Sequence, residues 1–361
     1  MTYTYVSQKF KEYDFWLRES RVLPPDLPEI KGVKIKDIIL LIEEGYRRGD
    51  IDRRKATILA TLIKYTLGYQ YRIVSDKHIV IIPRSRYLLN IFTAYPQLLA
   101  ILGNRHSGKT ITAWTIALQV LEKIDDITLW VYGDVDGLGE EIIRTRSELE
   151  DRIIVKNDYT LPPKDGKKRI IIYNELAPAL LGKRAMSGEN VELNLQALRS
   201  RHVNTWVIYN VIRAGSFEAV LRETADIKMI KWMSPELLQN AMQYFPHGIR
   251  DVIKNSVSLT ENEGIVLAPV KGKGFMIFLH ETNPPQWLLE AHKRAKKNSR
   301  LMMVKSERER YVLQRIGELY EKGLSTKAIK LILEKEGINL SERSIRMKRK
   351  KWEELTKSES L

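Results

Sequence analysis

The sequence contains no cysteine among its 361 residues. This absence excludes disulfide bonds, zinc–thiolate centres and thiol nucleophiles, and it is typical of proteins of a reducing compartment. A chain of this length buries a core large enough to fold without such cross-links. We therefore expect a cytoplasmic protein, located in the cytoplasm of the host if its origin is viral.

Long apolar runs are also missing, since none reaches the roughly 18 to 20 residues that a membrane-spanning helix needs. The first residues, MTYTYVSQKFKEYDFW, lack the basic-then-apolar order of a signal peptide. Histidine is scarce, and the six histidines show neither the spacing of metal ligands nor a recognisable nucleophile motif. The sequence therefore predicts no membrane contact and offers no support for a metalloenzyme with histidine ligands or a triad hydrolase.

Positive charge is what the sequence has in excess. Its 60 Lys and Arg outnumber 45 Asp and Glu, which gives a formal net charge of +15. Residues 291–361 carry +10 of this excess, with 20 basic and 10 acidic side chains. A basic tail that also contains structure favours a polyanion partner, most often nucleic acid. The alternative is the ion-paired surface of a heat-adapted protein, because abundant Ile, Lys and Glu without Cys is also typical of thermophiles.

The apolar pattern divides the chain into four segments. Residues 1–75 place apolar side chains at helical spacing and predict a helical N-terminal domain. In residues 76–285, short β-branched runs such as LLAIL and RIIIY alternate with helical stretches and end in a predicted hairpin, GIVLAPVKGKGFMIFLH. This alternation predicts an α/β domain, a parallel sheet covered by helices. A charge run after two prolines predicts a basic linker at 286–302, ahead of a domain at 303–361.

The last segment, 303–361, predicts a small all-α domain of three helices. Gly323 and Gly337 stand at C-cap positions, and Ser325 and Ser341 stand at N-cap positions. The short turn EGINL joins the last two helices, as in a helix-turn-helix, whose second helix enters the major groove of DNA. The alternative is a charged helix that is solvated or mediates subunit contacts. The residues predicted to bind DNA are Arg343, Arg346, Lys348, Arg349, Lys350 and Lys351.

A glycine-rich loop interrupts the stretch LLAILGNRHSGKTITAW and matches the Walker A pattern. Gly103 lets the backbone turn after the strand, and Gly108 lets a polyphosphate approach without a clash with Cβ. Lys109 supplies a charge to the β- and γ-phosphates, Thr110 offers a hydroxyl to Mg²⁺, and the next helix points its positive end at the phosphates. The predicted ATP-binding residues are Gly103, Asn104, Arg105, His106, Ser107, Gly108, Lys109 and Thr110.

A P-loop enzyme also needs an acidic pair at the end of a neighbouring strand, one group to hold Mg²⁺ through water and one to polarise the attacking water. The best match is RIIIYNELAP, which ends in Asn174 and Glu175. Glu175 is predicted to orient the attacking water. Asn174 stands where an aspartate is usual, and its amide is predicted to order metal-bound water together with Thr110.

Two further strands end in polar residues. NTWVIYN ends in Asn210, which is predicted to sense the γ-phosphate or its water, and WVYGDVD ends in Asp134 and Asp136. In open parallel sheets, ligands lie outside the carboxyl ends of the strands. These side chains are therefore candidates for the same site.

The stretch LNLQALRSRHVNTWVIYNVIRAGSFEAVLRETADIKMIKW resembles the HerA/FtsK superfamily of DNA-pumping ATPases, especially its viral genome-packaging branch. The shared order is a helix that runs into Arg201, a sensor strand with a polar end, a helix, and Arg222 before the last core strand. The resemblance covers residues 95–235 and implies a RecA-like P-loop NTPase core. It also implies a homo-oligomeric ring, commonly a hexamer, in which Arg222 or Arg201 of a neighbouring subunit completes the ATP site.

These features together predict a Mg²⁺-dependent ATPase that binds double-stranded DNA and couples hydrolysis to translocation, in packaging or segregation, with viral or plasmid assembly partners. One alternative is an AAA+-type replication initiator or loader, because the sensor of that class is commonly an asparagine like Asn210. The other is an ATP-switched DNA-binding regulator that does not hydrolyse its nucleotide, which the neutral Asn174 allows.

Overall fold

The computed structural model describes residues 21–76, 78–134, 137–156, 162–163, 165–174, 204–211, 225–242, 245, 247–270, 274–302 and 307–357. The described residues fall into two compact units. The sheet unit lies within Met1–Gly133 and Leu149–Pro285, and the helical unit lies within Asp134–Glu148 and Gln286–Leu361. No helix in these described ranges combines the length and the apolar character that crossing a bilayer requires.

The sheet unit is built on a nine-stranded sheet of order β1-β13-β12-β11-β6-β10-β9-β7-β8. The strands from β11 to β8 in this order are parallel, whereas β12 runs antiparallel to both of its neighbours. β6 is separated from the next strand of the chain, β7, by β10 and β9, which is the interleaved order of RecA-like cores and confirms the predicted α/β fold. The strands are β1 (Arg21–Val22), β6 (Leu98–Leu102), β7 (Ile127–Tyr132), β8 (Ile153–Lys156), β9 (Lys168–Tyr173), β10 (Thr205–Val211), β11 (Ile227–Ile230), β12 (Glu263–Val270) and β13 (Gly274–Glu281).

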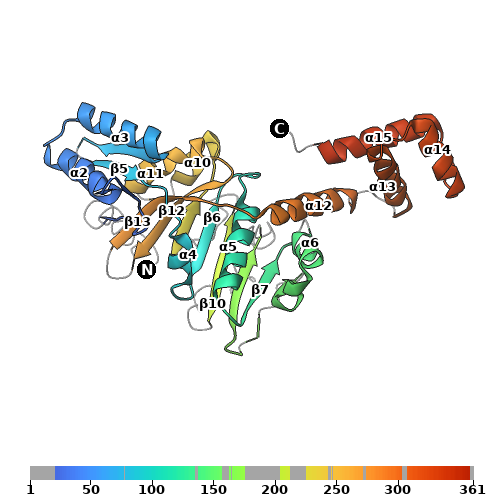
Figure 1. Cartoon of the computed structure of the whole chain (residues 1–361), viewed down its shortest axis with the longest axis horizontal. Helices are drawn as coiled ribbons and strands as arrows, with labels where there is room; N and C mark the ends of the chain where they lie inside the picture. The colour runs from blue at the N-terminus through green and yellow to red at the C-terminus, as the bar shows by residue number, and fades with distance from the viewer. Residues whose placement is uncertain are drawn as a thin grey trace. The chain divides into compact units, whose positions relative to one another are not determined.

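The central strands are rich in apolar residues because both faces of the sheet are covered. Every residue of β6 and β10 is buried. Helix α5 (Lys109–Lys123) lies on one face, against β6, β7, β9 and β10 (Figure 1). Helices α10 (Pro235–Met242) and α11 (His247–Ile253) contribute to the core cluster on the other face. The short 3-10 helices are Ser147–Arg152 and Lys254–Ser258.

Three tyrosines form a stacked row across neighbouring strands of this sheet. Tyr132, Tyr173 and Tyr209 occupy paired positions on β7, β9 and β10, with ring centroids 5.0 and 4.9 Å apart. Offset stacking of this kind adds to the stabilisation from burial, and burial raises the pKa of Tyr209. The row fixes the register of the three strands immediately before their carboxyl ends, where Asn174 and Asn210 follow.

The described part of the range predicted as a helical N-terminal domain, residues 21–75, contains two helices and also paired strands. Helices α2 (Ile35–Arg48) and α3 (Arg53–Leu67) end at glycines in the left-handed conformation, and the Asp52 side chain caps the start of α3. Between α3 and the sheet lies an antiparallel pair, β4 (Gln70–Ser75) and β5 (His78–Ile82), which packs on α2, α3 and α11. The remaining elements are β2 (Glu29–Ile30), β3 (Val33–Lys34) and α4 (Leu88–Thr93).

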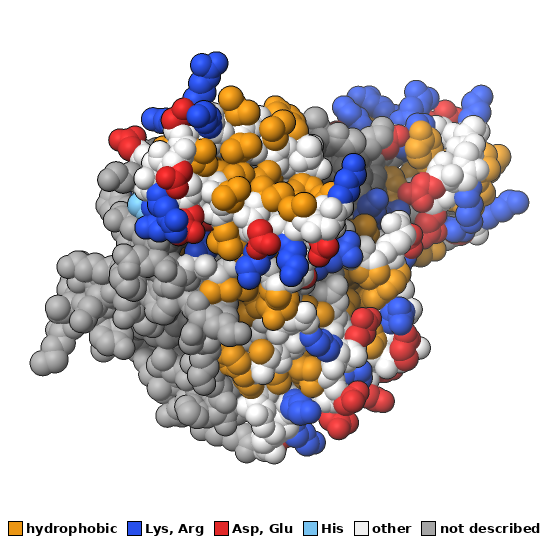
Figure 2. All heavy atoms as spheres, turned by 60° about the vertical axis from the view of Figure 1, so that its left-hand side comes forward, with side chains coloured by type: hydrophobic (Ala, Val, Ile, Leu, Met, Phe, Trp, Pro, Cys, Tyr) orange, Lys and Arg blue, Asp and Glu red, His pale blue; other side chains and the backbone are white. Residues whose placement is uncertain are grey.

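The outer faces of α2 and α3 expose large apolar side chains. Leu41 is 73% exposed on α2, and Ile58, Leu62 and Tyr65 are exposed on α3. Figure 2, which turns this side of the sheet unit toward the viewer, shows hydrophobic side chains gathered among charged ones. The inner faces of the same helices carry the buried isoleucines and alanines of a separate core cluster.

The helical unit contains α6 (Leu138–Thr145) and α12 (Gln286–Met302), which pack together. Residues 286–302, which were predicted as a basic linker, therefore form a helix. The charged side chains of this segment lie at helical spacing, and one of them, Arg294, pairs with the buried carboxylate of Glu141 on α6. Although burial alone opposes it, Arg144 and Arg294 lower the pKa of Glu141, so the pair stays charged.

The helical unit ends in three helices, α13 (Glu307–Glu321), α14 (Thr326–Lys335) and α15 (Glu342–Lys357). The predicted caps are confirmed: the Ser325 and Ser341 hydroxyls accept backbone N–H bonds at 3.3 and 3.1 Å, and Gly323 and Gly337 are left-handed. The three helices share a core that consists of Val312, Ile316, Leu319, Ile329, Leu333 and Ile345.

One aromatic side chain locks α15 onto α13. Trp352 is 2% exposed, and its indole lies against Gly317, where a Cβ would stand only 2.1 Å from Trp352 Cε2. Gly317 therefore provides the hollow that receives the ring. Lys297 Nζ of α12 lies 4.6 Å from the centroid of the Trp352 ring and forms a cation–π contact with it.

Candidate nucleotide-binding site

The loop that joins β6 to α5 has the geometry of a phosphate cradle. Its start is held between two strand ends, because Gly103 N donates to Val211 O at 3.2 Å and Asn104 N donates to Trp232 O at 3.1 Å. His106 and Gly108 have φ angles of 62° and 77°. Left-handed residues in such a loop turn successive N–H groups toward one side and create an anion-binding nest. The helix begins at Lys109, so its unpaired first amides face the same side.

Lys109 is placed inside this loop. Its side chain is buried, and Nζ donates to Gly103 O at 2.9 Å and to Asn104 O at 2.5 Å. These carbonyls hold the ammonium where phosphate oxygens would approach the nest. Thr110, in the first turn of α5, is half-buried.

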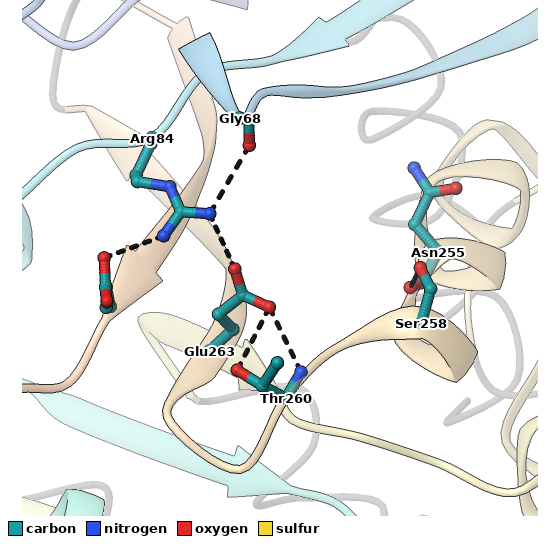
Figure 3. Close-up of polar contacts among 7 residues, drawn as sticks. Gly68, Arg84, Asn255, Ser258, Thr260 and Glu263 are labelled. Atoms are coloured by element: carbon teal, nitrogen blue, oxygen red, sulfur yellow. Dashed lines mark hydrogen bonds and ion pairs between the residues drawn. The ribbon is translucent and has the colours of Figure 1, made fainter. Parts of the chain in front are cut away.

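A wall that the sequence did not predict closes the loop beside Gly108. A Cβ at this position would lie 2.5 Å from the carbonyl oxygen of Glu261, in the turn before β12. Glu263 fixes that turn, since its Oε2 accepts from Thr260 N at 3.1 Å and from Thr260 Oγ1 at 3.2 Å (Figure 3). Its Oε1 accepts from Arg84 at 2.7 Å. The loop therefore depends on Gly108 for space as well as for its φ angle.

Asn174 and Asn210 meet at the carboxyl edge of the sheet, as predicted. Asn210 Nδ2 donates to Asn174 Oδ1 at 2.7 Å, and both side chains are buried. Asn210 Oδ1 is buried and finds no hydrogen-bond partner among the described residues. A buried acceptor without a donor costs about 1–3 kcal/mol, so this oxygen is suited to receive a donor such as water. The Asn174 oxygen, which was expected to order metal-bound water, is occupied by Asn210.

Of the acidic residues predicted to lie at the site, the structure describes Asp134, which has another role. Asp134, in the helical unit, accepts from Leu138 N at 3.1 Å and from Gly139 N at 2.7 Å, and thus caps α6. The described ranges contain no group of three acidic or histidine side chains arranged to hold a metal ion. Mg²⁺ in phosphate sites commonly relies on one or two protein carboxylates together with the phosphates. Of the residues predicted to hold it, Thr110 offers a hydroxyl and Asn174 an amide oxygen. Glu175, Asp136, Arg201 and Arg222 lie outside the described residues.

Lys231, which the sequence reading missed, is fully buried beside the P-loop. It follows β11 directly, and its Nζ donates to Thr112 Oγ1 at 3.0 Å. Burial lowers its pKa to about 7, and the neighbouring Lys109 acts in the same direction. The available signal was a lysine at the end of an apolar run, IKMIKW, in a sheet buried on both faces.

The basic residues of α15 divide into two groups. Arg349 is engaged within the unit, since its guanidinium stacks 3.4 Å from the centroid of the Tyr320 ring and pairs with Glu353 at 3.0 Å. Lys348 is half-buried. Arg346 makes only a solvent-exposed pair with Glu342, at 3.4 Å. Among the side chains of α15 whose exposure is described, up to residue 354, the exposed cations are Arg343, Arg346, Lys350 and Lys351.

No protein-family model matches the sequence, and a search of curated proteins finds no match. Among solved structures, the chain is similar to B204, the DNA-packaging ATPase from Sulfolobus Turreted Icosahedral Virus, with 13% identity over 52% of this chain and 98% of that chain and a TM-score of 0.38. It is similar to the pCW3 conjugation coupling protein TcpA with ATPγS, with 10% identity over 64% and 83% and a TM-score of 0.39. It is also similar to ATPases 2 and 3 of EssC from Geobacillus thermodenitrificans, with 10% identity over 56% and 44% and a TM-score of 0.34.

The class of protein follows from this chain's own residues. The interleaved parallel sheet, the loop after its central strand and the lysine buried in that loop define an α/β P-loop protein. The chain adds to this core a compact helical unit that ends in a basic helix.

Proposed function

We propose that the protein is a Mg²⁺-dependent ATPase that acts on double-stranded DNA. The observation that carries the proposal is the buried Lys109 ammonium inside a loop with two left-handed residues at the N-terminus of α5. A cation, a nest of amides and a helix N-terminus converge there, and together they favour a polyphosphate over other anions.

Each residue at the edge of the sheet has a role in this proposal. Lys109 and the loop amides hold the phosphates, and Thr110 and Asn174 would hold Mg²⁺, which when bound would offset the charge of the phosphates. For this role the Asn174 oxygen would give up the hydrogen bond that it accepts from Asn210. Asn210 Oδ1, the acceptor without a partner, receives a hydrogen bond from the attacking water. Glu175 orients that water.

The proposal includes a homo-oligomeric ring, because the resemblance to the HerA/FtsK superfamily implies one. A ring of subunits places an arginine of one subunit, Arg222 or Arg201, at the ATP site of the next. Such an arginine stabilises the charge of the transition state and contributes about 10³–10⁵ in rate in P-loop enzymes that use one. A motor for DNA packaging or segregation is the proposed use of this turnover.

Steady-state ATP hydrolysis, with and without double-stranded DNA, tests the proposed activity. The wild-type protein is expected to be stimulated by DNA, and Glu175→Gln is expected to lose about 10²–10⁴ in turnover, because a general base contributes that much. Glu122→Gln, at an exposed position near the end of α5, is the control and keeps wild-type turnover. Slow turnover that DNA does not change would support a nucleotide-switched initiator or loader instead. Wild-type turnover equal to that of Glu175→Gln would support a regulator without hydrolysis.

The DNA contact is assigned to the exposed cations of α15, the second helix of a helix-turn-helix formed with α14. Replacing Arg343, Arg346 and Lys350 with alanine is expected to weaken binding and to reduce the slope of log affinity against log salt by about 2–3, because each lost phosphate contact removes about 0.9 from the slope. The measurement is binding of a labelled duplex by fluorescence anisotropy at several salt concentrations.

A matched control removes the same charge from another surface. The exposed lysines Lys36, Lys55 and Lys64 lie on α2 and α3 of the sheet unit. Their replacement with alanine is expected to leave the salt slope within about 0.5 of the wild-type value. Equal losses in both triple variants would assign DNA binding to net charge and not to α15.

A further inference from the structure

Lys231 occupies a position where a charged side chain is costly. It follows the last residue of β11, its backbone N–H donates to Leu102 O at 2.7 Å, and its exposed fraction is 0%. The strand lies between β6 and β12. A buried ammonium without a carboxylate partner is destabilising, so its retention calls for a physical reason.

Two glycines make room for this side chain, one directly after β6 and one on β12. A Cβ at Gly103, directly after β6, would lie 2.8 Å from Lys231 Cβ. A Cβ at Gly264 on β12 would lie 3.3 Å from Lys231 Cδ. The lysine stem thus runs through a channel that exists because both flanking positions lack a side chain.

The ammonium ends under the first turn of α5. Lys231 Nζ donates to Thr112 Oγ1 at 3.0 Å, and Thr112 Oγ1 lies 3.2 Å from Thr282 Oγ1. Thr112 N in turn donates to Gly108 O at 2.9 Å, within the Walker A loop. A short chain of polar contacts therefore joins the lysine to the phosphate cradle.

Four charged or titratable groups of the described residues face Lys231. Lys109 of α5 disfavours its charge, and Lys231 in turn lowers the pKa of His280 on β13. Glu263, the first residue of β12, and Glu261, in the turn before that strand, favour the charged lysine. No described carboxylate makes an ion pair with Nζ, and Glu263 is bonded to Arg84 at 2.7 Å. Burial is the largest effect and lowers the pKa of Lys231 to about 7.

We propose that Lys231 is a positioning residue of the nucleotide site, which takes up a proton from solvent when a polyphosphate binds in the cradle beside it. The inference rests on the proposed function in one respect, that the P-loop binds a polyphosphate. The negative charge of the phosphates stabilises the ammonium form, and the charged Lys231 holds Thr112 and the first turn of α5 in place under the phosphates. The neutral amine gains the proton, and no other bond changes.

The direction of the pH dependence follows from linkage. Polyphosphate raises the pKa of Lys231 from about 7 toward the ordinary lysine value, so the bound state holds more protons than the free state above pH 7. Affinity therefore falls as pH rises through this window. With a bound pKa of about 9 to 10, the loss of Mg–ADP affinity between pH 7 and pH 9 is about 25- to 50-fold.

The experiment is calorimetric titration of the full-length protein with Mg–ADP at pH 8, in two buffers that differ in ionisation enthalpy. At this pH the free lysine is about one-tenth protonated, so wild-type protein is expected to take up about 0.8 proton per bound nucleotide. Lys231→Met, whose unbranched side chain fits the same channel, is expected to bind Mg–ADP with uptake close to zero. Lys228→Met is the matched control, because Lys228 is a half-exposed lysine on the same strand, and it keeps the wild-type uptake.

The outcomes separate this inference from the proposed function. Absence of Mg–ADP binding by the wild-type protein overturns the proposed function and this inference with it. Binding without proton uptake, or with equal uptake in wild-type protein and Lys231→Met, overturns the role of Lys231 alone. Should Lys231→Met fail to fold, the wild-type pH profile still decides, because affinity that is constant between pH 7 and pH 9 contradicts the proposal.

Discussion

Replacing Lys109 with alanine is expected to abolish nucleotide binding at micromolar concentrations. The ammonium is buried and bonded to two loop carbonyls, so the variant loses the cation and leaves Gly103 O and Asn104 O without it. Truncating one partner of a buried charge pair costs about 2–5 kcal/mol, which corresponds to a loss in affinity of roughly thirty- to several-thousandfold. Calorimetric titration with Mg–ATP or a slowly hydrolysed analogue measures this effect.

Lys123→Ala provides the control for that experiment because it removes a lysine from the far end of the same helix. Lys123 Nζ forms an exposed hydrogen bond with Asn90 at 2.7 Å. This variant is expected to bind nucleotide as the wild type does. Unchanged nucleotide affinity in Lys109→Ala would contradict the assignment of this loop as a phosphate-binding P-loop, together with every role derived from that assignment.

Trp352→Ala is expected to unfold the three-helix end of the helical unit. The indole is almost fully buried against Gly317, and its loss leaves a cavity in a small unit whose core cluster has six buried aliphatic side chains. Deleting a buried tryptophan costs about 3–5 kcal/mol, which is a large share of the stability of so small a unit. Hydrogen exchange of the full-length protein is expected to show at least a hundredfold loss of amide protection in α13–α15, at about 1.4 kcal/mol per tenfold.

Met347→Ala, on the same helix, separates this effect from a general loss of apolar surface. Met347 is 66% exposed, so the variant is expected to change stability by no more than about 0.5 kcal/mol. Because α15 carries the cations assigned to DNA, Trp352→Ala is also expected to bind DNA more weakly, with the ATP site intact. Full protection of α13–α15 in Trp352→Ala would show that the indole does not hold the three helices together.

Features with a local cause could be predicted from the sequence. The strand, loop and helix around the P-loop follow from an apolar run, two glycines and a lysine within a short stretch. The caps at Ser325 and Ser341 follow in the same way, since a hydroxyl at a helix start bonds an amide three residues later. The location of Asn174 and Asn210 at one edge of the sheet followed from topology, because parallel strands end at one edge, whereas the hydrogen bond between them was not predicted.

Features with a tertiary cause could not be predicted. The charged residues of segment 286–302 are typical of a linker. The partner of Arg294 in the folded protein is the Glu141 carboxylate, which is far away in the sequence. Arg349 counted as a DNA contact because nothing in the sequence places Tyr320 beneath it. The wall beside Gly108 depends on Glu261, in a turn that is held by a distant arginine. In each case the decisive partner lies too far along the chain for spacing to indicate it.

The channel around Lys231 has a consequence for how this sequence can diverge. Gly103 is already constrained by its position in the Walker A loop. Gly264 lies outside that loop, and its lack of a Cβ leaves space for the Met229 and Lys231 side chains. An alanine at 264 becomes tolerable only once those two side chains shorten or move. Positions 229, 231 and 264 should therefore vary together among descendants of this chain, so that a lineage becomes free to lose the glycine only after both Met229 and Lys231 have changed.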